Sequence, residues 1–313
     1  MAEGLPREQQ RGQLAPAVAR AYDASNVTFR VLRAFGWGPL LNLGYYPFRP
    51  PLTLLNFVVT PLVFTPFFRL PAAQLKLVKK AVALLELRDG CRVLDVGCGR
   101  GTSSYLMANA FPQAQVTGID LLAENIAAAR TLYDNTPNLT YREGDATCLD
   151  FPERSFDRVL CLEAAFEFCD RVGFLRQLGR VSAAGARAVI VDFMWKDEAA
   201  RRLCDNEDGR LVQRTWQWED FDSVAEYRRN AEANGFEVAA CLDWSPHVTA
   251  PLRSVFDLVA RLSRTEPGRT LLRWYHPPLR TLTAGDWQEF VRSARAHQHV
   301  HRYSRYVALV LRR

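Results

Sequence analysis

A glycine-rich turn between Val93 and Gly101 is the part of the sequence best suited to holding a ligand. It reads Val-Leu-Asp-Val-Gly-Cys-Gly-Arg-Gly, so an apolar strand ends in an acid, Asp95, and continues into glycines at alternate positions. Glycine lacks a Cβ atom and adopts left-handed backbone conformations, which lets the chain approach a ligand closely. By itself, such a turn fits a dinucleotide site or a tight turn without a ligand.

Two further acids stand at the ends of the next expected strands. Asp120 closes Gly-Ile-Asp, and a carboxylate there can accept hydrogen bonds from both hydroxyl groups of a ribose. Asp145, in Glu-Gly-Asp-Ala, can accept one from the amino group of an adenine. The sequence has no second phosphate-binding glycine turn and no Walker lysine. The three acids and the glycine turn therefore predict one nucleoside-sized site.

Together with Phe156-Asp157, these motifs resemble those of the class I S-adenosylmethionine-dependent methyltransferases, and the resemblance covers about Leu75 to Val191. It implies S-adenosylmethionine as cofactor, and no metal site is expected. It also implies that Gly97 and Gly99 line the methionine moiety and that Asp95 organises its amino end. Asp120 would then hold the ribose, and Asp145 with Ala146 the adenine. The other expected cofactor-binding residues are Tyr45, Cys98, Gly101, Leu121 and Leu162.

The acceptor side is expected at the end of the fourth strand, between Leu162 and Phe168. With Leu41 to Tyr46, this segment looks like the lipid and natural-product branch of the family, which includes sterol, tocopherol, phthiotriol and antibiotic-sugar methyltransferases. Several of these have a His-His pair where this chain has Phe166-Glu167. A histidine base is therefore not available at that position.

Methyl transfer from a sulfonium is an in-line displacement that depends on positioning, and an oxygen or carbon acceptor can also need a base. Glu167 can serve as that base if burial raises its pKa; the alternative is that it faces solvent on a short helix. His247 is a second candidate, although a lone histidine is more often structural. Tyr45 and Tyr46 either close over the sulfonium through cation–π contact or form a buried aromatic pair.

The sequence also narrows the acceptor. The fourth strand is not followed by an Asn-Pro-Pro-Tyr-like stretch, which disfavours methylation of adenine N6 or a glutamine amide, nor by Pro-Cys for cytosine carbon chemistry. Several aromatic residues either wall an apolar pocket or belong to an ordinary core. These are Trp216, Trp218, Trp244, Trp274 and Tyr275. We expect methylation of oxygen or carbon on a small, largely apolar acceptor of polyketide, terpenoid or lipid type.

The elements that position these groups alternate between strand and helix patterns. Strands are predicted at Arg92–Val96, at Gln115–Ile119, near Thr140, Val159 and Val189, at Phe236–Leu242 and at Tyr306–Leu311. Helices are predicted at Leu75–Leu87, Ser103–Ala110 and Ala123–Tyr133, and residues 248–300 form a helix-rich insertion. The pattern predicts an α/β fold: a Rossmann-like, mostly parallel seven-stranded sheet flanked by helices, with an apolar N-terminal cap and a helical insertion before the last strand. Residues 1–74 would form the cap and residues 75–313 the cofactor-binding domain.

The cap segment from Pro39 to Leu70 is strongly apolar. A helix over Leu52–Phe68 would reach only about 25 Å, against roughly 30 Å of hydrocarbon, and Pro61 and Pro66 would interrupt it. The segment is therefore not expected to cross a membrane. A buried cap, a substrate lid and an interfacial membrane patch remain as alternatives.

Composition and charge fit one elaborated domain of 313 residues with a net charge of +6. The basic excess lies late in the chain at helical spacing, which favours a solvated face over a nucleic-acid interface. Seven cysteines without paired Cys-x-x-Cys spacing disfavour a disulfide framework or a zinc site. The start of the sequence lacks the apolar core of a secretion signal, so we expect a cytoplasmic protein, with peripheral membrane association as an alternative.

Two other functions stay open at this stage. One is an RNA or protein methyltransferase that uses the basic C-terminal region. The other is a protein that binds S-adenosylmethionine but acts as a cyclase or scaffold. The sequence carries no signal for an oligomeric state.

Overall fold

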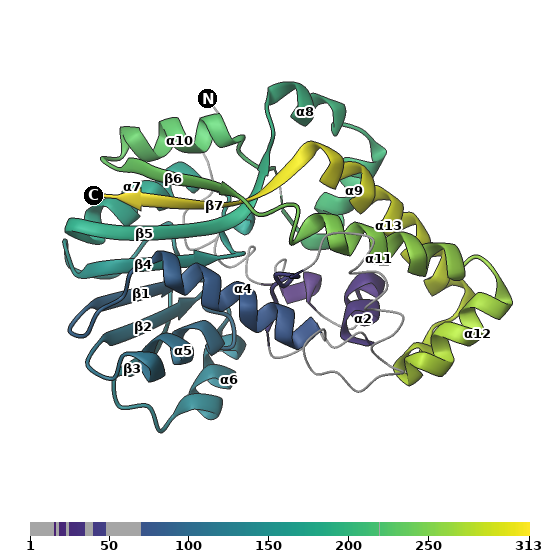
Figure 1. Ribbon diagram of the computed structural model, residues 1–313, viewed down its shortest axis with the longest axis horizontal. Coiled ribbons are helices and arrows are strands. Elements are labelled where there is room, and N and C mark those ends of the chain that lie inside the picture. Colours follow the sequence, from purple (N-terminus) through teal and green to yellow (C-terminus); the bar gives the residue numbers. More distant parts are fainter. Residues whose placement is uncertain (1–15, 17–18, 23–24, 35–39, 48–69, 219) are drawn as a thin grey trace.

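Seven strands form one sheet in the order β3-β2-β1-β4-β5-β7-β6 (Figure 1). Their bounds are β1 Arg92–Val96, β2 Gln115–Asp120, β3 Leu139–Glu143, β4 Phe156–Leu162, β5 Ser182–Trp195, β6 Glu237–Asp243 and β7 Ser304–Arg312. The first five are parallel, and β7 runs antiparallel to both of its neighbours. The predicted Rossmann-like sheet is confirmed. Strand β1 pairs with β2 on one side and β4 on the other, which creates the switch point where ligands bind in open α/β sheets.

The computed structural model describes residues 16, 19–22, 25–34, 40–47, 70–218 and 220–313. Of the apolar segment from Pro39 to Leu70, this includes only 40–47 and the first residue of a helix. The expected cap, lid or membrane patch thus lies mostly outside the described residues. Within the described ranges, none of the helices combines the length and apolar character needed to cross a bilayer.

Both faces of the sheet are buried, which explains the continuous apolar runs of its strands. Alternate residues of a strand point to opposite faces. Leu94 and Val96 accordingly join the core on one side with Phe174, while Val93 joins the core on the other side with Leu77. The first core takes residues from α7 (Arg171–Val181) and α10 (Val224–Ala233), the second from α4 (Leu70–Leu84) and α5 (Thr102–Ala110).

The helices near the cofactor motifs agree closely with the sequence pattern. Helix α5 begins one residue before the predicted Ser103, and α6 (Ala123–Tyr133) has the predicted bounds. Helix α4 begins at Leu70 instead of Leu75. The predicted start is too late. Pro71 lies in the first turn of the helix, where proline is well tolerated because the N–H group that it lacks would have no partner within the helix.

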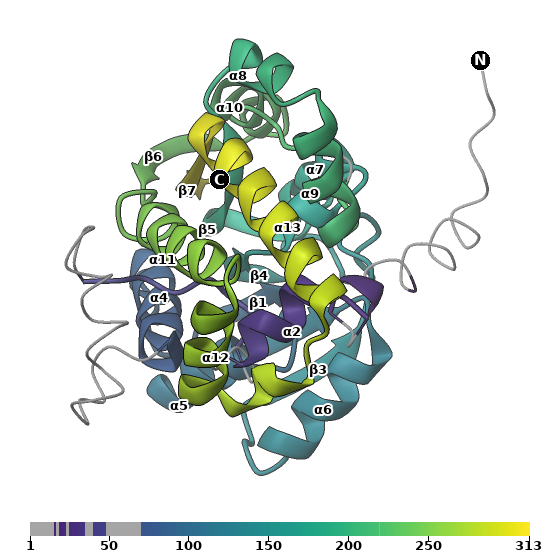
Figure 2. The same cartoon turned by 90° about the vertical axis from the view of Figure 1, so that its right-hand side faces the viewer.

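A second layer of helices lies beyond the carboxyl ends of the parallel strands (Figures 1 and 2). It contains α2 (Val27–Ala34), α8 (Glu198–Leu203), α9 (Glu207–Trp216), α11 (Thr249–Leu262), α12 (Glu266–Tyr275) and α13 (Ala284–Tyr303). The helical insertion between β6 and β7 is therefore confirmed. Helix α13 contacts α2, α9 and α11, and a separate core joins Val27 and Val31 to Trp287 and Phe290.

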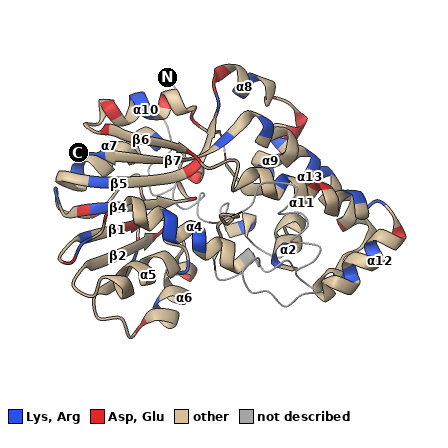
Figure 3. Cartoon of the chain, viewed as in Figure 1, with Lys and Arg blue, Asp and Glu red and all other residues tan. Residues whose placement is uncertain are grey.

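Basic and acidic residues are interspersed along the helices of this layer (Figure 3). Arg261 pairs with Asp257 at 2.6 Å, Arg269 with Glu266 at 2.7 Å, and Arg292 with Glu207 of another helix. Such mixed pairing is typical of a solvated surface.

Candidate active site

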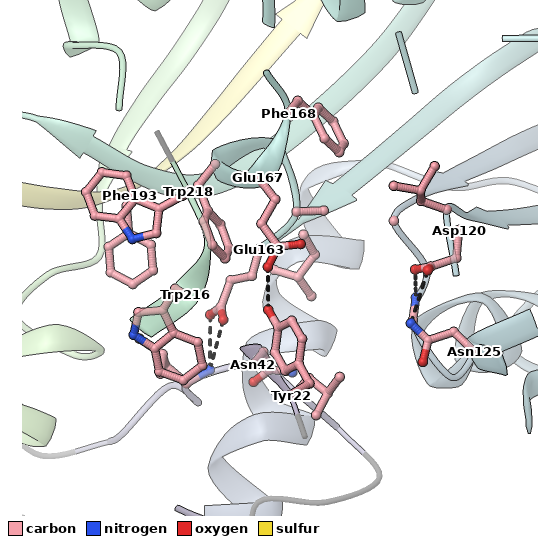
Figure 4. A pocket seen from close by; sticks show the side chains of 18 of the residues that line it. Tyr22, Asn42, Asp120, Asn125, Glu163, Glu167, Phe168, Phe193, Trp216 and Trp218 are labelled. Carbon is pink, nitrogen blue, oxygen red and sulfur yellow. Dashed lines mark hydrogen bonds between the residues drawn. The ribbon is translucent and has the colours of Figure 1, made fainter. Parts of the chain in front are cut away.

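A cavity of about 510 Å³ lies between the carboxyl ends of the strands and the helical layer (Figure 4). Most of the predicted site residues line it. These are Gly97, Cys98, Gly99, Asp120, Leu121, Asp145, Ala146, Leu162 and Glu167. Four others do not line it: Asp95, Gly101, Tyr45 and His247.

The three glycines of the turn all adopt positive φ angles, of 67° at Gly97, 54° at Gly99 and 82° at Gly101. A Cβ atom at Gly97 would stand 2.4 Å from the Cβ of Ala164, and one at Gly101 would stand 2.3 Å from Oη of Tyr141. At Gly99 the same atom would meet nothing within 4 Å. Gly97 and Gly101 thus permit close packing within the protein, whereas Gly99 leaves space on the cavity side.

These differences predict separable effects of two matched substitutions. Gly101→Ala should lower the free energy of unfolding by about 2 to 4 kcal/mol, because a left-handed φ and a steric clash act together. Gly99→Ala should lower it by only about 1 kcal/mol, yet its methyl group should reduce cofactor affinity at least about 10-fold. Denaturant unfolding and calorimetric titration would measure the two quantities. Equal cofactor affinity of Gly99→Ala and wild type would contradict the assignment.

Asp95 stabilises the start of α5, next to the glycine turn, without lining the cavity. Its Oδ2 atom accepts hydrogen bonds from Oγ of Ser103 at 2.6 Å and Oγ of Ser104 at 2.7 Å. Burial raises the pKa of Asp95 to about 6, against the lowering effect of these two bonds. Since Ser103 lines the cavity and Asp95 does not, Asp95 acts on that surface through the start of α5.

Asp120 joins the end of β2 to the glycine turn by a hydrogen bond. Its Oδ2 accepts from the backbone N–H of Gly99 at 2.8 Å, and its Oδ1 accepts from Leu122 N and Asn125 Nδ2, each at 3.0 Å (Figure 4). Burial raises the pKa of Asp120, while these bonds oppose the rise. Asp145 binds locally through Oδ1, which accepts from N and Oγ1 of Thr147 at 2.8 and 2.7 Å.

This half of the cavity fits S-adenosylmethionine. The open side of Gly99 admits a ligand against the backbone, and the carboxylates of Asp120 and Asp145 are acceptors of the kind that ribose hydroxyls and an adenine amino group require. When bound, this cofactor supplies a methyl group on a positively charged sulfur.

Glu167 points into the cavity from the short helix η2 (Ala165–Glu167). Its Oε1 atom accepts a hydrogen bond of 2.8 Å from the hydroxyl of Tyr22 (Figure 4). Burial raises the pKa of Glu167 to about 8, and the charges of Asp120 and Asp192 act in the same direction. The sequence left two alternatives for Glu167, a buried carboxylate or one that faces solvent. In the described structure its side chain lies inside the cavity, away from bulk solvent.

Glu163, just after the end of β4, lines the cavity and is not among the site residues predicted from the sequence. It has a φ of 50°, an uncommon backbone conformation for a residue other than glycine. Its carboxylate accepts a short hydrogen bond from Oη of Tyr306, and both its oxygens lie 3.1 to 3.2 Å from N of Leu43. Burial raises its pKa to about 8. The sequence does carry one signal for Glu163, namely an acid at the end of an apolar strand. A buried acid is costly unless it has a partner, so such a residue deserves a functional explanation.

Tyr45 and His247 stack on one another beside the cavity instead of lining it, with ring centroids 4.7 Å apart. Nδ1 of His247 lies 3.0 Å from O of Tyr46, and N of Tyr46 donates to O of His247 at 2.8 Å. Nζ of Lys80 stands 4.6 Å from the centre of the Tyr45 ring. In the described structure the cations over Tyr45 are Lys76 and Lys80, and Tyr45 and Tyr46 are both buried but lie in two different hydrophobic clusters.

Of the five aromatic residues proposed for an apolar pocket, Trp216 and Trp218 line the cavity. Trp244 instead packs edge-on against Tyr45 at 5.7 Å, and Trp274, which contacts Tyr275, is 65% exposed. We use the name acceptor chamber for Trp216, Trp218 and the cavity residues around them. They are Phe193, Val212, Trp216, Trp218, Phe221, Phe256, His297 and His301.

Two imidazoles in the acceptor chamber are held neutral. Nε1 of Trp216 donates to Nε2 of His297 at 2.6 Å, so Nδ1 of His297 carries the proton and donates to O of Ser293 at 2.7 Å. His301 stacks on Phe193 at 5.3 Å. Burial lowers the pKa of His297 to about 4 and that of His301 to about 3.

The chain is similar to known methyltransferases. A family model described as a methyltransferase domain matches residues 93–185. The chain is similar to 2-methyl-6-phytyl-1,4-hydroquinone methyltransferase of Synechocystis, with 29% identity over 83% of this chain and 79% of that one. It is also similar to a probable tocopherol O-methyltransferase of rice, with 27% identity over 75% of this chain and 63% of that one.

The fold resembles that of geranyl diphosphate C-methyltransferase of Streptomyces coelicolor, solved with S-adenosyl-L-homocysteine, Mg²⁺ and geranyl-S-thiolodiphosphate. The TM-score is 0.67 over 97% of both chains, at 16% identity. The matched domain, the sheet order and the cofactor motifs agree with one another. Residues 93–185 therefore form a methyltransferase domain, and the chain is similar to class I S-adenosylmethionine-dependent methyltransferases of the branch that includes lipid and natural-product enzymes.

Proposed function

We propose that the enzyme transfers the methyl group of S-adenosylmethionine to an oxygen or carbon of a small, largely apolar acceptor. The observation that carries this proposal is a single cavity in which the cofactor half adjoins the aromatic acceptor chamber, with Glu163 and Glu167 lining the same space. The similar proteins of Synechocystis and rice are named for a phytyl hydroquinone and for tocopherol, which supports an apolar acceptor with a ring hydroxyl.

In this proposal Gly97, Gly99, Asp120 and Asp145 hold the cofactor, together with Cys98, Leu121, Ala146 and Leu162. Asp95 positions the turn through Ser103 and Ser104. The walls of the chamber orient the acceptor, because much of the barrier to an in-line displacement can be removed by positioning alone.

Glu167 is the proposed base. It takes the proton that the acceptor hydroxyl loses as its oxygen gains the methyl group. Phe166 and Phe168 flank it and also line the cavity, so they exclude water from the carboxylate. His247 has no part in this scheme, because it lies outside the cavity lining and binds the backbone of Tyr46.

The test is incubation of the purified protein with S-adenosylmethionine labelled in the methyl group and with three acceptor sets: prenylated or alkylated phenols, RNA, and a peptide mixture. Label should enter the organic phase with the phenols. Label found only in RNA or peptide would support the macromolecular alternative. A product that forms equally well with S-adenosylhomocysteine, which lacks the methyl group, would support a cyclase. A cytoplasmic location and peripheral contact with a membrane remain predictions from the sequence.

A further inference from the structure

We propose that the exposed side of helix α12 docks on an anionic lipid bilayer. The surface concerned, which we call the α12 patch, consists of Pro267, Leu271, Trp274, Pro277 and Pro278. The inference goes beyond the proposed function, because it concerns the outer surface of the helical layer instead of the cavity. It also involves none of the residues of the apolar segment from Pro39 to Leu70.

The outward side of α12 carries apolar groups where a solvated helix normally carries charges. Trp274 is 65% exposed and Leu271, three positions earlier, is 44% exposed, so the two side chains are neighbours on one face. Pro267 lies one turn before Leu271 on the same face and is exposed, as are Pro277 and Pro278 just after the helix. A single exposed apolar residue needs no explanation, whereas several adjacent ones mark an interaction surface.

The charges of α12 lie to the side of this patch. The structure describes all ten residues of the helix, and among them only Glu266, at the first position, is both charged and exposed. It pairs with Arg269 at 2.7 Å and with Arg273 at 2.8 Å. On the buried side, Leu272 joins the core that contains Trp287. One apolar side of α12 is thus used for packing, and the other is left in contact with solvent.

Two arginines stand at the ends of the α12 patch. Arg264 precedes the helix and Arg280 follows Pro278, and both are exposed. Neither forms an ion pair with an acid in the part of the chain that the structure describes. Tryptophan is favoured at the interface between water and lipid, because its ring is apolar and its N–H is polar. Arginines beside it would meet the negative headgroups of an anionic bilayer.

The same arginines disfavour a second copy of the chain as the occupant of this surface. In a twofold dimer a surface patch meets itself. Arg264 and Arg280 would then face the arginines of the other copy, with no acid in the α12 patch to pair with them. An anionic bilayer instead supplies both an apolar layer for the leucine and tryptophan and negative charge for the arginines.

Helix α12 lies at the end of the helical layer that is farthest from the sheet (Figure 1), and it faces the viewer in Figure 2. It contacts α11 and the short helix η3 (Pro277–Thr281), and η3 contacts α2. Phe256 of α11 and Phe29 of α2 both line the cavity. Docking through the α12 patch would therefore hold these cavity-lining helices close to the bilayer, in which a largely apolar acceptor of the proposed kind dissolves.

Co-sedimentation of the purified full chain with lipid vesicles tests this inference. The protein should bind vesicles of phosphatidylcholine and phosphatidylglycerol in equal parts, and its partition coefficient should be about 10-fold lower or less on phosphatidylcholine alone. Leu271→Ser with Trp274→Ser should lower binding to the anionic vesicles about 10-fold or more, because both side chains lose their contact with the interface. Arg264→Gln with Arg280→Gln should also weaken this binding and make it less sensitive to salt.

Two matched controls change exposed residues elsewhere on the molecule. Leu132→Ser replaces a leucine of α6 that is 57% exposed, and Arg88→Gln replaces an exposed arginine that precedes β1. Both proteins should bind the anionic vesicles as the wild type does. All of these variants should keep the wild-type affinity for S-adenosylhomocysteine, which would show that their fold and cavity are intact.

Equal partition of the wild-type protein onto the two kinds of vesicle would overturn the inference, and this comparison does not depend on any variant. Wild-type vesicle binding by a folded protein with Leu271→Ser and Trp274→Ser would also overturn it. So would a dimer, seen by analytical ultracentrifugation and lost in that double variant, in a protein that does not bind vesicles. Failure of the wild type to bind S-adenosylhomocysteine would instead overturn the proposed function, so the two failures are distinguishable.

Discussion

Replacement of Asp120 by alanine should reduce the affinity for S-adenosylmethionine and S-adenosylhomocysteine by about 100-fold or more. The carboxylate accepts hydrogen bonds from Gly99, Leu122 and Asn125, and in the proposed scheme it also accepts from the ribose. Each hydrogen bond to a charged group contributes roughly 1.5 to 3 kcal/mol, and the loss of one partner leaves the others unsatisfied. Isothermal titration of the purified variants would measure the change directly.

A matched control is Asp134→Ala, which removes an exposed acid just after α6 and should retain wild-type affinity. Thermal unfolding without ligand separates loss of binding from loss of fold. Wild-type affinity in a folded Asp120→Ala protein would refute the assignment of the ribose to this acid.

Glu167→Gln should lower turnover by about 100-fold or more while cofactor affinity stays near the wild-type value. Glutamine keeps the shape and can still accept the hydrogen bond from Tyr22, but it cannot take a proton, and general base catalysis typically contributes factors of 10² to 10⁴. The measurement is the rate of methyl transfer with a saturating phenolic acceptor, beside a titration of the same protein with S-adenosylhomocysteine.

The pH dependence supplies the control for this assignment. In the proposed scheme the deprotonated form of Glu167 is the active form. Because burial raises its pKa to about 8, the wild-type rate should rise with pH through about 8. Tyr22→Phe removes a hydrogen bond that lowers this pKa, so the rise should move to higher pH. A Glu167→Gln protein with wild-type turnover and an unchanged pH profile would show that the residue is structural.

The cofactor half could be predicted from the sequence because its determinants are local. The strand Arg92–Val96 and the helix Ala123–Tyr133 have the bounds that periodicity predicts. The glycines that follow β1 have positive φ angles, which is a local requirement for glycine, although the side chains that a Cβ atom would meet at Gly97 and Gly101 belong to the distant Ala164 and Tyr141. Aliphatic runs between turn residues predict where these strands and helices begin and end.

The acceptor half was harder to predict because its contacts join distant parts of the chain. Tyr22 reaches Glu167 across 145 positions, and Glu163 is held by Tyr306 across 143. His297 and His301 lie on a helix whose pattern gives no sign that they border a cavity. His247 was a reasonable candidate by position, but the fold turns it toward Tyr46. These contacts form only when helices and strands from distant parts of the chain pack together, so the local sequence does not predict them.

The antiparallel pairing of β6 with β7 has a consequence for how this enzyme could diversify. Asp243, the last residue of β6, is the register partner of Val307, close to the start of β7, so the two strand ends that flank α11, α12 and α13 are neighbours in the sheet. Such neighbouring ends can be joined by a hairpin of a few residues or by an insertion of any size. A change in the length of this one insertion would therefore alter the part of the cavity that α11 and α13 line, while the ends of the parallel strands keep their places in the sheet.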